Sequence, residues 1–429
     1  MLNNVKFQGY IKCAKSLIKT SNVKKIWLLL FTLVFVYIMF VGKEQQWVKD
    51  EIVEEILDIR KYDGTWRNLT EGEINKLSVL GRILYLEEER PQQKENQYLI
   101  LFWKYGQYLK NRHFNYFTKE TYDPLNSCSV KNCKFTFNDT DLKTADAVIF
   151  HLHRTKGLQD LPKDHENPNQ IWAFLTDESP YHTFMKSKVK ISDFDKKFNW
   201  SMTYRMDSDI PVPYGRARKF SEKVPMIKSK KYVEKRKDRL VTILGSNCGG
   251  KNHRWQYVKK MNESIHVDVY GGCGNKTACP GHFKSDCPAI DSYLFYLSFE
   301  NSDCREYITE KVFWNAYHKE SIPVIMGYDK KTYEKLLPPL SYLHVDDFAS
   351  PKDLADYILF LNRTEEYKKY FQWKEDFEIV NEHGYFKTKS YHLCRICEAL
   401  NFNKKIQKYM TNSKISGANP KIVKVEHKY

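Results

Sequence analysis

Short apolar runs recur along the chain after about residue 96, and each is closed by glycine or by a charged turn. Apolar runs with such boundaries are typical of strands buried on both faces of a parallel sheet. The pattern predicts three strands in the first part of this region, within YLILFWKYG (98–106), ADAVIFHLH (145–153) and NQIWAFLT (169–176). It predicts further strands in the second part, within RLVTILGSNC (239–248), IHVDVYGGCG (265–274), YLFYLSFEN (293–301), SIPVIMG (321–327) and LHVDDF (343–348).

Segments with helical spacing separate several of these strands. HRWQYVKKMNE (253–263) lies between two of them, and further helices are expected at 308–318 and 351–361. Strand–helix–strand units of this kind build doubly wound α/β folds. The charged stretch 227–239 has no apolar period and is expected to link two domains. The predicted fold class is therefore α/β, with two Rossmann-like domains that face each other across a cleft.

A longer apolar run lies near the start of the chain. IWLLLFTLVFVYIMFVG (26–42) is uncharged and just long enough to cross a bilayer as a helix. Six lysines and no acidic residue precede it, so the positive-inside rule keeps that end in the cytoplasm and places the rest of the chain in the lumen. A cleaved signal peptide is the alternative, but no small-x-small cleavage site follows the run. We expect a cytoplasmic tail (1–25) and a signal-anchor transmembrane helix (26–42) with type II topology.

The next segment, residues 43–95, is rich in Glu, Lys, Gln and Arg. This composition predicts a partly helical, poorly packed stem between the membrane and a globular body. The total length of 429 residues suits two domains with such appendages. The formal net charge of +16 comes from lysines spread along the chain, with no nucleic-acid-binding motif among them. The charge therefore indicates a solvated surface, and no nucleic-acid partner is expected.

Two further features agree with a lumenal body. Nine of the ten cysteines follow the apolar run, where an oxidising compartment favours disulfides. Because nine is odd, one of these cysteines is expected to be free or bonded to another chain. Sequons for N-glycosylation begin at Asn68, Asn138, Asn199, Asn262, Asn275 and Asn362.

Some of the cysteines allow a metal or redox interpretation. A zinc site is the alternative for the candidate ligands Cys273, Cys279, His282 and Cys287. Their spacings differ from the usual close pairs of zinc ligands, so disulfides are favoured. The C-terminal Cys-Arg-Ile-Cys has no thioredoxin-like context before it, which favours a structural clasp over a redox pair.

The strongest motif of the chain is FENSDCREYITEKVFWNAYHKESIPVIMG (299–327), followed later by a strand that ends in His-Val-Asp-Asp-Phe. This stretch resembles the donor-binding motif of the α1,3/4-fucosyltransferases of glycosyltransferase family 10. FNWSMTYRMDSDIPVPYG (198–215), the Glu-Ser-Pro turn at 178–180 and the Ser-Asn-Cys with its following Arg at 246–254 match as well. The resemblance covers roughly residues 96–400, and several motifs in the same order argue against chance.

The resemblance implies a GT-B fold and an inverting α1,3-fucosyltransferase. Such an enzyme moves L-fucose from GDP-fucose to a GlcNAc hydroxyl of a glycoprotein glycan at the Golgi membrane. It implies an acceptor-binding domain at 96–228, a GDP-fucose-binding domain at 229–385 and a C-terminal segment with a basic tail at 386–429. No cofactor is expected to be required for the chemistry, and stimulation by a divalent cation, Mn or Mg, is left open.

Chemistry gives the donor motif roles that agree with the resemblance. A nucleotide diphosphate leaving group needs fixed cations and N–H groups around its β-phosphate. Lys311 lies in the first turn of its expected helix, and Arg254 lies near the start of the preceding one, so both suit phosphate binding. In the family, the residue that matches Glu310 is assigned to ribose hydroxyls, and those that match Asn301 and Tyr307 lie near the fucose and pyrophosphate. The alternative is an ordinary helix cap followed by a surface cation.

Direct displacement also needs a base for the acceptor hydroxyl. Glu178 follows an apolar strand, precedes Pro180 and matches the proposed general base of the family. The alternative is that Asp177 and Glu178 only cap the next helix.

The same half contains three other polar groups that are candidates for a functional role. Asp207-Ser208-Asp209 has the Asp-x-Asp spacing that holds manganese in many GT-A glycosyltransferases. No donor strand leads into it, and in the family it belongs to a structural turn, so no catalytic metal is expected. His151 and His153 follow a buried strand, and a contact with the acceptor is a hypothesis beside the more common structural role.

The resemblance also supports a clasp between two close cysteine pairs, with its order left open: Cys128 and Cys133 with Cys394 and Cys397. The cysteine-rich segment 271–288 and Cys304 look more like invertebrate and core-type members than Lewis-type ones. The acceptor is therefore either the innermost GlcNAc of an N-glycan or an outer N-acetyllactosamine unit. Two rival functions stay open: a metal-dependent GT-A transferase that uses another nucleotide sugar, and a non-catalytic, membrane-tethered glycan-binding protein.

Overall fold

The computed structural model describes most of the chain beyond residue 65. The described residues are 31–37, 39, 64, 66–113, 123–163, 167–184, 189–223, 235–249, 252–275, 278–279, 285–384, 386 and 388–404. The chain divides into two compact units, Met1–Lys61 and Tyr62–Tyr429.

In the first unit, residues 31–37 and 39 are helical and exposed. Within the described part of the chain, no helix is both long and apolar enough to cross a membrane. Much of the predicted anchor at 26–42 and all of the predicted tail at 1–25 lie outside the described residues, so both stay predictions.

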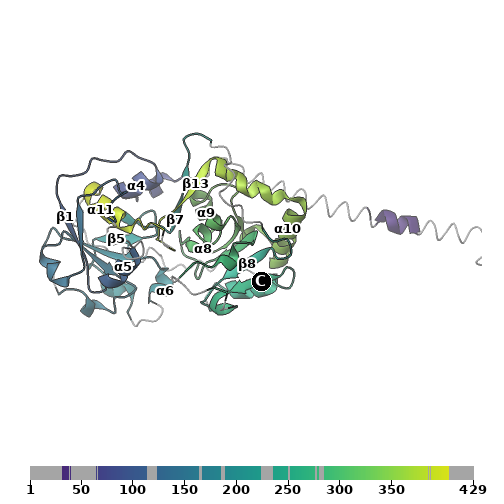
Figure 1. The fold of residues 1–429 in the computed structure, drawn as a ribbon, viewed down its shortest axis with the longest axis horizontal. Coiled ribbons are helices and arrows are strands. Elements are labelled where there is room, and N and C mark those ends of the chain that lie inside the picture. Colours follow the sequence, from purple (N-terminus) through teal and green to yellow (C-terminus); the bar gives the residue numbers. More distant parts are fainter. Residues whose placement is uncertain are drawn as a thin grey trace, which may run out of the picture. The chain divides into compact units, whose positions relative to one another are not determined.

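The N-terminal half of the second unit is built on a parallel sheet in the order β2-β1-β3-β4-β5-β6. Its strands are β1 (Tyr98–Phe102), β2 (Cys133–Thr136), β3 (Ala147–His151), β4 (Ile171–Thr176), β5 (Trp200–Thr203) and β6 (Ile210–Pro211). Every residue of β4 is buried, as its continuous apolar run predicts. The helix α5 (Gly106–His113) follows β1. This sheet lies on the blue side of the molecule in Figure 1.

The C-terminal half has a second parallel sheet in the order β12-β11-β10-β8-β9. Its strands are β8 (Val241–Leu244), β9 (Val267–Tyr270), β10 (Phe295–Phe299), β11 (Ile322–Met326) and β12 (Leu343–His344). The helices between and after them are α7 (Arg254–Met261), α8 (Glu310–Phe313), α9 (Lys330–Leu336) and α10 (Pro351–Thr364). The prediction of an α/β fold with two parallel sheets is therefore confirmed.

The helix predicted over 308–318 is shorter in the structure. It consists of the single turn α8, followed by the 3₁₀ turn η7 (Tyr317–Lys319). Thr309 has extended dihedral angles and caps α8 through its side chain, which accepts from the N–H of Lys311, so the helix begins only after it. The cap places Glu310 and Lys311 at the very start of the helix.

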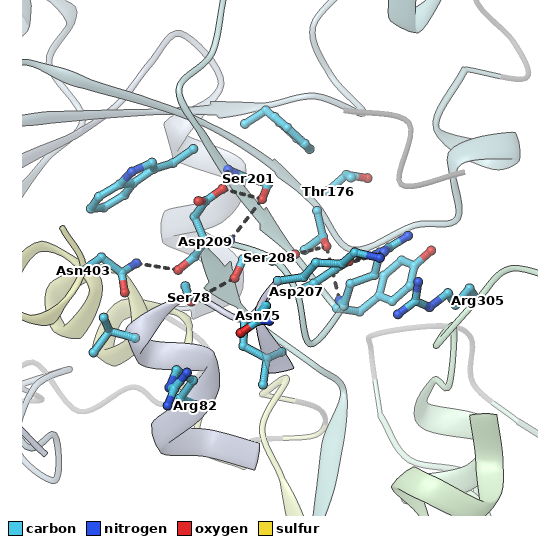
Figure 2. A pocket seen from close by; sticks show the side chains of 18 of the residues that line it. Asn75, Ser78, Arg82, Thr176, Ser201, Asp207, Ser208, Asp209, Arg305 and Asn403 are labelled. Atoms are coloured by element: carbon cyan, nitrogen blue, oxygen red, sulfur yellow. Dashed lines mark hydrogen bonds and ion pairs between the residues drawn. The ribbon is translucent and has the colours of Figure 1, made fainter. Parts of the chain in front are cut away.

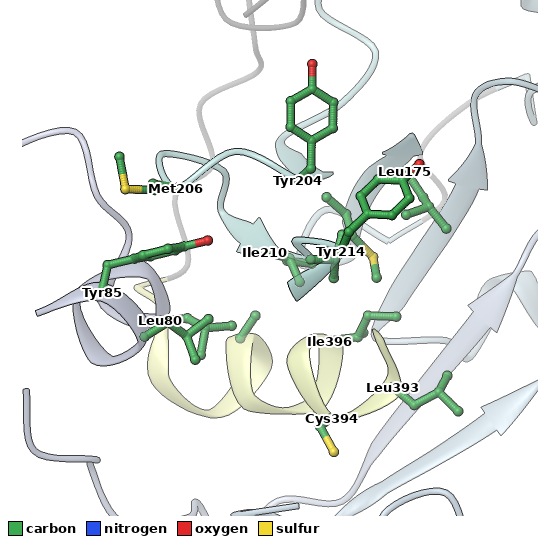
Figure 3. Packing of buried hydrophobic residues seen from close by; sticks show 14 of the residues in the cluster. Leu80, Tyr85, Leu175, Tyr204, Met206, Ile210, Tyr214, Leu393, Cys394 and Ile396 are labelled. Atoms are coloured by element: carbon green, nitrogen blue, oxygen red, sulfur yellow. The ribbon is translucent and has the colours of Figure 1, made fainter. Parts of the chain in front are cut away.

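An antiparallel pair of strands, β7 (Gly215–Lys219) and β13 (Phe377–Asn381), joins the end of the N-terminal half to a segment after α10. The chain then returns to the N-terminal half as α11 (His392–Phe402), which is buried along its whole length. Figure 3 shows Leu393 and Ile396 of α11 packed in one cluster with Leu80 and Ile210 of the N-terminal half. Within the predicted C-terminal segment at 386–429, α11 is thus part of the core of that half, and residues 405–429 lie outside the described part.

The prediction of a poorly packed stem at 43–95 is wrong for residues 66–86, whereas residues 87–95 are exposed and form no helix or strand. Residues 66–86 form α3 (Glu71–Ile74) and α4 (Val79–Tyr85), and the apolar side chains of α4 are buried in the main core. Arg67 donates to the carbonyl oxygens of Ala217 and Lys335, which ties the segment to both halves. The spacing of Leu80, Ile83 and Leu84 gives α4 one apolar face, a signal that the abundance of charged residues hid. Residues 43–63 and the linker residues 224–234 lie outside the described part.

Four disulfides account for eight of the nine cysteines that follow the apolar run. They join Cys128 to Cys394, Cys133 to Cys397, Cys248 to Cys273 and Cys279 to Cys287. The first two form the expected clasp and assign its order, with Cα–Cα distances of 5.3 and 5.9 Å. Cys304 is the free cysteine that the odd count predicted. The zinc alternative is wrong because its three cysteines are all used in disulfides.

The sequons differ in exposure. Asn68, Asn138, Asn262 and Asn275 are exposed, whereas Asn199 and Asn362 are half-buried. The Asn199 side chain also accepts a hydrogen bond of 2.6 Å from the N–H of Trp172. Because glycan attachment needs an accessible side chain, the four exposed residues are the better candidates for modification.

Candidate active site

The donor motif folds into a short buried unit between the end of β10 and the start of α8. Glu300, which is only 1% exposed, accepts from the N–H and the hydroxyl of Thr309 at 2.9 and 2.8 Å. Its other oxygen lies 3.0 Å from Nζ of Lys311. The carboxylate thus ties the end of the strand to the start of the helix. Sequence reasoning gave Glu300 no role, although it lies in the Phe-Glu-Asn-Ser motif.

Lys311 is the cation of this unit. Its Nζ lies 3.0 Å from a Glu300 oxygen and 3.2 Å from Oε1 of Glu310. Burial by itself would lower the pKa of Lys311, but the Glu300 and Glu310 carboxylates outweigh this effect and raise the pKa. The ammonium group is therefore charged at neutral pH and is held at the start of a helix.

Arg254 is the second cation and opens α7. It is 4% exposed, and its terminal nitrogens donate to the carbonyl oxygens of Phe299 at 3.0 Å and Asn247 at 2.7 Å. Its buried Nε has no hydrogen-bond partner among the described residues. A buried, unpaired N–H of a guanidinium group points to an acceptor atom that a bound ligand supplies.

In the N-terminal half, the turn after β4 separates a structural carboxylate from an accessible one. Asp177 accepts from Arg112 at 2.7 Å and lies 3.0 Å from Nε2 of His383, and its carbonyl oxygen accepts from Tyr214 at 2.8 Å. Burial opposes ionisation of Asp177, but Arg112 and His383 hold its pKa well below the usual range. Asp177 is therefore an ionised, fully paired group that fixes the turn.

Glu178 points instead toward the C-terminal half. Its Oε2 accepts from the Tyr307 hydroxyl at 3.1 Å and from Nδ2 of Asn301 at 3.4 Å. The helix α6 (Pro180–Phe184) is capped by Ser179, whose hydroxyl accepts from the N–H of His182. The alternative that Glu178 is only a helix cap is therefore wrong.

These groups meet in one cavity of about 460 Å³ between the two sheets, here called the interdomain cavity. All six residues predicted for catalysis and donor binding line it: Glu178, Arg254, Asn301, Tyr307, Glu310 and Lys311. His151 and His153 line it as well, and their contact with the acceptor stays a hypothesis. Burial lowers the pKa of His151 to about 4, although Asp177 opposes the shift, so this imidazole is neutral at physiological pH. A volume of this size lies in the usual range of about 300–1,000 Å³ for small-molecule sites.

A second cavity of about 650 Å³ lies in the N-terminal half, at the ends of β4 and β5 (Figure 2). Asp207 and Asp209 both line it. Asp207 is paired with Arg205 at 2.7 Å, and Asp209 accepts from the N–H and hydroxyl of Ser201 at 2.9 and 2.8 Å. The two carboxylates hold their own turn together, and no group of three metal-ligating side chains occurs among the described residues. Glu178 is the one described residue that lines both cavities.

Comparison with known proteins relates both halves to one family. A family model described as "Fucosyltransferase, N-terminal" matches residues 95–215, and one described as "Glycosyltransferase family 10 (fucosyltransferase) C-term" matches residues 234–415. Glycoprotein 3-alpha-L-fucosyltransferase A of Drosophila melanogaster is 36% identical over 66% of this chain, which covers 53% of that protein. Alpha-(1,3)-fucosyltransferase 7 of Rattus norvegicus is 34% identical over 60% of this chain, which covers 65% of that protein.

Other relatives are covered more completely. Over 71% of this chain there is 33% identity to 4-galactosyl-N-acetylglucosaminide 3-alpha-L-fucosyltransferase 9 of Mus musculus, of which 77% is covered. A crystal structure of an alpha1,3-fucosyltransferase with GDP-fucose aligns with 74% of this chain and 94% of that one, at 14% identity and a TM-score of 0.42. A likeness of that size adds nothing to the assignment, which rests on the sequence matches. These matches run through both halves and include the residues of the interdomain cavity, and on that ground the chain belongs to glycosyltransferase family 10, the fucosyltransferases.

Proposed function

We propose that this protein is an inverting α1,3-fucosyltransferase that moves L-fucose from GDP-fucose to a GlcNAc hydroxyl of a glycoprotein glycan. One observation carries the proposal. The buried Arg254 and the half-buried Lys311, both at helix starts, and one carboxylate from the opposite half line the same interdomain cavity. A phosphate-binding side and a proton-accepting side that face each other are what transfer from a nucleotide sugar requires.

The diphosphate binds on the side of the C-terminal half. Lys311 and Arg254 neutralise the charge that grows on the β-phosphate as it leaves, and the unpaired Nε of Arg254 supplies a further donor. Glu310 lines the same cavity and accepts from the ribose hydroxyls. Asn301 and Tyr307, which bond Glu178, place the fucose between the phosphates and the base.

Glu178 takes the proton of the acceptor hydroxyl. The acceptor oxygen forms its bond to C1 of fucose while the bond from C1 to the β-phosphate oxygen breaks, and GDP leaves with the electron pair. The proton passes to Glu178, whose bonds to Tyr307 and Asn301 orient the carboxylate. Because GDP-fucose is β-linked, a single displacement gives an α-fucoside.

The acceptor and the compartment are part of the proposal. The similar fly protein is named as a glycoprotein fucosyltransferase, and the similar mouse protein is named for a galactosyl-N-acetylglucosaminide acceptor. Both the innermost GlcNAc of an N-glycan and an outer N-acetyllactosamine unit are thus candidate acceptors. We place the enzyme in the Golgi membrane, with a GT-B body in the lumen behind the anchor at 26–42, and with no metal required for the chemistry.

Product analysis tests the proposal. Full-length protein in detergent is incubated with GDP-fucose and two acceptors, a glycopeptide with an unmodified N-glycan core and an N-acetyllactosamine oligosaccharide, and the linkage of the product is determined. An α1,3-fucosylated product is expected, and it should persist in a chelator. Loss of activity in the chelator would favour the metal-dependent rival, and glycan binding without any transfer would favour a non-catalytic protein.

A further inference from the structure

The second cavity is larger than the interdomain cavity, and no step of the proposed reaction uses it. Four separate segments of the described chain line it: the α3–α4 turn with the start of α4, the ends of β4 and β5 with the turns that follow, Arg305 of the loop after β10, and the chain after α11. Figure 2 shows Asn75 and Ser78 from the first of these segments facing Ser208 and Asp209 of the second, with Asn403 of the fourth close by. Contacts between the segments hold the walls in place.

The chemistry of this cavity suits carbohydrate better than a nucleotide. Its lining includes amides, hydroxyls and the aromatic rings of Trp200 and Tyr204. The amides and hydroxyls can hydrogen-bond sugar hydroxyls, whereas the two rings are buried, with Trp200 2% and Tyr204 5% exposed. Five cations among the described residues line the cavity. Arg205 is paired with Asp207, Arg305 with Glu306 at 2.9 Å and Arg82 with Glu88 at 2.6 Å, whereas Lys76 and Lys404 are exposed. No helix start with a buried, unpaired cation occurs in this described lining, in contrast to the interdomain cavity.

The second cavity also reaches the proposed base. Glu178 lines both cavities, and the ring of Tyr204 lies 5.0 Å from the ring of Tyr307, whose hydroxyl bonds Glu178. A glycan whose reacting hydroxyl meets Glu178 can therefore extend away from the donor into this space. We propose that the second cavity binds the oligosaccharide chain beyond the reacting GlcNAc, an inference that rests on the proposed function.

The test introduces a large side chain at the rim of the second cavity. Asn75 and Lys76 are exposed and follow the last residue of α3, so a large side chain there can occupy the cavity without opening the core. Full-length Asn75→Trp and Lys76→Trp are compared with Glu71→Trp, an exposed position on the preceding helix α3 that does not line the cavity. Steady-state KM is measured for GDP-fucose, for a simple GlcNAc glycoside and for a complete N-glycan on a glycopeptide.

Both cavity variants should raise KM for the complete glycan by about tenfold, which corresponds to about 1.4 kcal/mol. KM for GDP-fucose and for the simple glycoside should stay unchanged, and Glu71→Trp should match the unaltered enzyme in all three. The proposal would be overturned if KM rose equally for the complete glycan and the simple glycoside, or if KM for the complete glycan rose in neither cavity variant. Absence of fucose transfer by the unaltered protein would instead overturn the proposed function, and a shift in thermal midpoint would reveal a folding defect.

Discussion

At the scale of single residues, the strongest prediction concerns Glu178. Replacement Glu178→Gln keeps the shape of the side chain and its bonds to Tyr307 and Asn301 but cannot take up the proton. We expect kcat to fall by about 10²–10⁴ while the affinity for GDP-fucose survives. Steady-state kinetics together with a binding titration of the donor measures both. Near-normal turnover would remove Glu178 from the mechanism and leave His151 and His153 as the next candidates.

The two cations should act on the donor side. Arg254→Ala and Lys311→Ala are each expected to weaken GDP-fucose binding by about 1.5–3 kcal/mol, because each removes a charge-assisted contact to phosphate. Lys311→Ala also leaves Glu300 buried without its partner, at a cost of about 3–5 kcal/mol in stability. Measuring KM for the donor and for the acceptor, together with the free energy of unfolding, separates the loss of donor binding from the loss of stability.

Lys319→Ala is the matched control for Lys311→Ala. Lys319 is buried in the same half and pairs with Asp286 at 2.8 Å and Asp291 at 2.5 Å, but it does not line the interdomain cavity. It should reproduce a loss of stability without the loss of donor affinity. If Arg254→Ala, Lys311→Ala and Lys319→Ala all bind GDP-fucose as tightly as the unaltered protein does, the phosphates bind elsewhere.

At the scale of elements, two loops of the C-terminal half form one wall of the interdomain cavity. The carbonyl oxygen of Asn247 accepts from Arg254 and from Trp255, so the loop after β8 sets the position of the guanidinium. The loop after β9 packs against it: a Cβ at Gly271, which has φ +82°, would lie 2.8 Å from the carbonyl oxygen of Gly245. The disulfide Cys248–Cys273 joins the two loops covalently.

Removal of this disulfide should therefore weaken the binding of the donor. The double variant Cys248→Ser/Cys273→Ser is expected to raise KM for GDP-fucose severalfold, because the support of Arg254 becomes looser, while KM for the acceptor stays unchanged. Cys304→Ser, which removes the free thiol, is the control and should leave donor KM unaltered. A rise in acceptor KM alone would contradict this account of the loops.

At the scale of the whole molecule, buried histidines join the N-terminal half to the C-terminal segment. His113 at the end of α5 stacks on His392 of α11 at 4.2 Å, and both contact the hydroxyl of Ser390. His383 lies next to His113 and bonds Asp177. Burial, reinforced by the charge of Arg112, lowers the pKa of His113 and of His392 well below the ordinary value of 6.5.

This cluster predicts a loss of stability in mild acid. Below pH 6.5, His113 and His392 bind protons in the unfolded chain but stay neutral in the folded protein. The free energy of unfolding should therefore fall by about 1.4 kcal/mol for each of these two residues with every unit by which the pH is lowered. Asp177, whose pKa is depressed, loses its contribution only near and below pH 4 and does not enter this range. Urea unfolding between pH 7.5 and 5.5 measures the slope, which His113→Gln should reduce and the exposed His266→Gln should leave unchanged. A slope that His113→Gln does not alter would contradict the assignment.

The separation of the chain into two units bears on the predicted anchor. Residues 62–429 form a compact unit that contains both cavities, so a fragment that lacks residues 1–43 should remain folded, soluble, glycosylated and active. Activity in the culture medium of cells that secrete this fragment, with a mass shift after removal of N-glycans, is the measurement. An intact but inactive fragment would assign the removed segment more than a localising role.

The sequence by itself predicted the α/β class, the five strands of the C-terminal sheet and, in the N-terminal sheet, β1, β3 and β4 but not the short strands β2, β5 and β6. The strands follow from local information, because a continuous apolar run is buried wherever the chain places it. The placement of Glu310 and Lys311, the residues proposed to bind the donor, follows from a motif in which neighbouring positions share one helix start. Where charged residues dominated the composition, as around α4, the same local reasoning failed and predicted a stem in place of buried core.

Only the tertiary structure decided the order of the cysteine clasp, the different roles of Asp177 and Glu178, and the existence of the second cavity. Cys128 and Cys394 are 266 residues apart, and no local pattern specifies which sulfur of a close pair lies nearer. Asp177 and Glu178 are adjacent in sequence, but Arg112 and His383 hold the first while Tyr307 of the other half orients the second. Such contacts depend on how distant segments pack together, which the sequence of each segment does not contain.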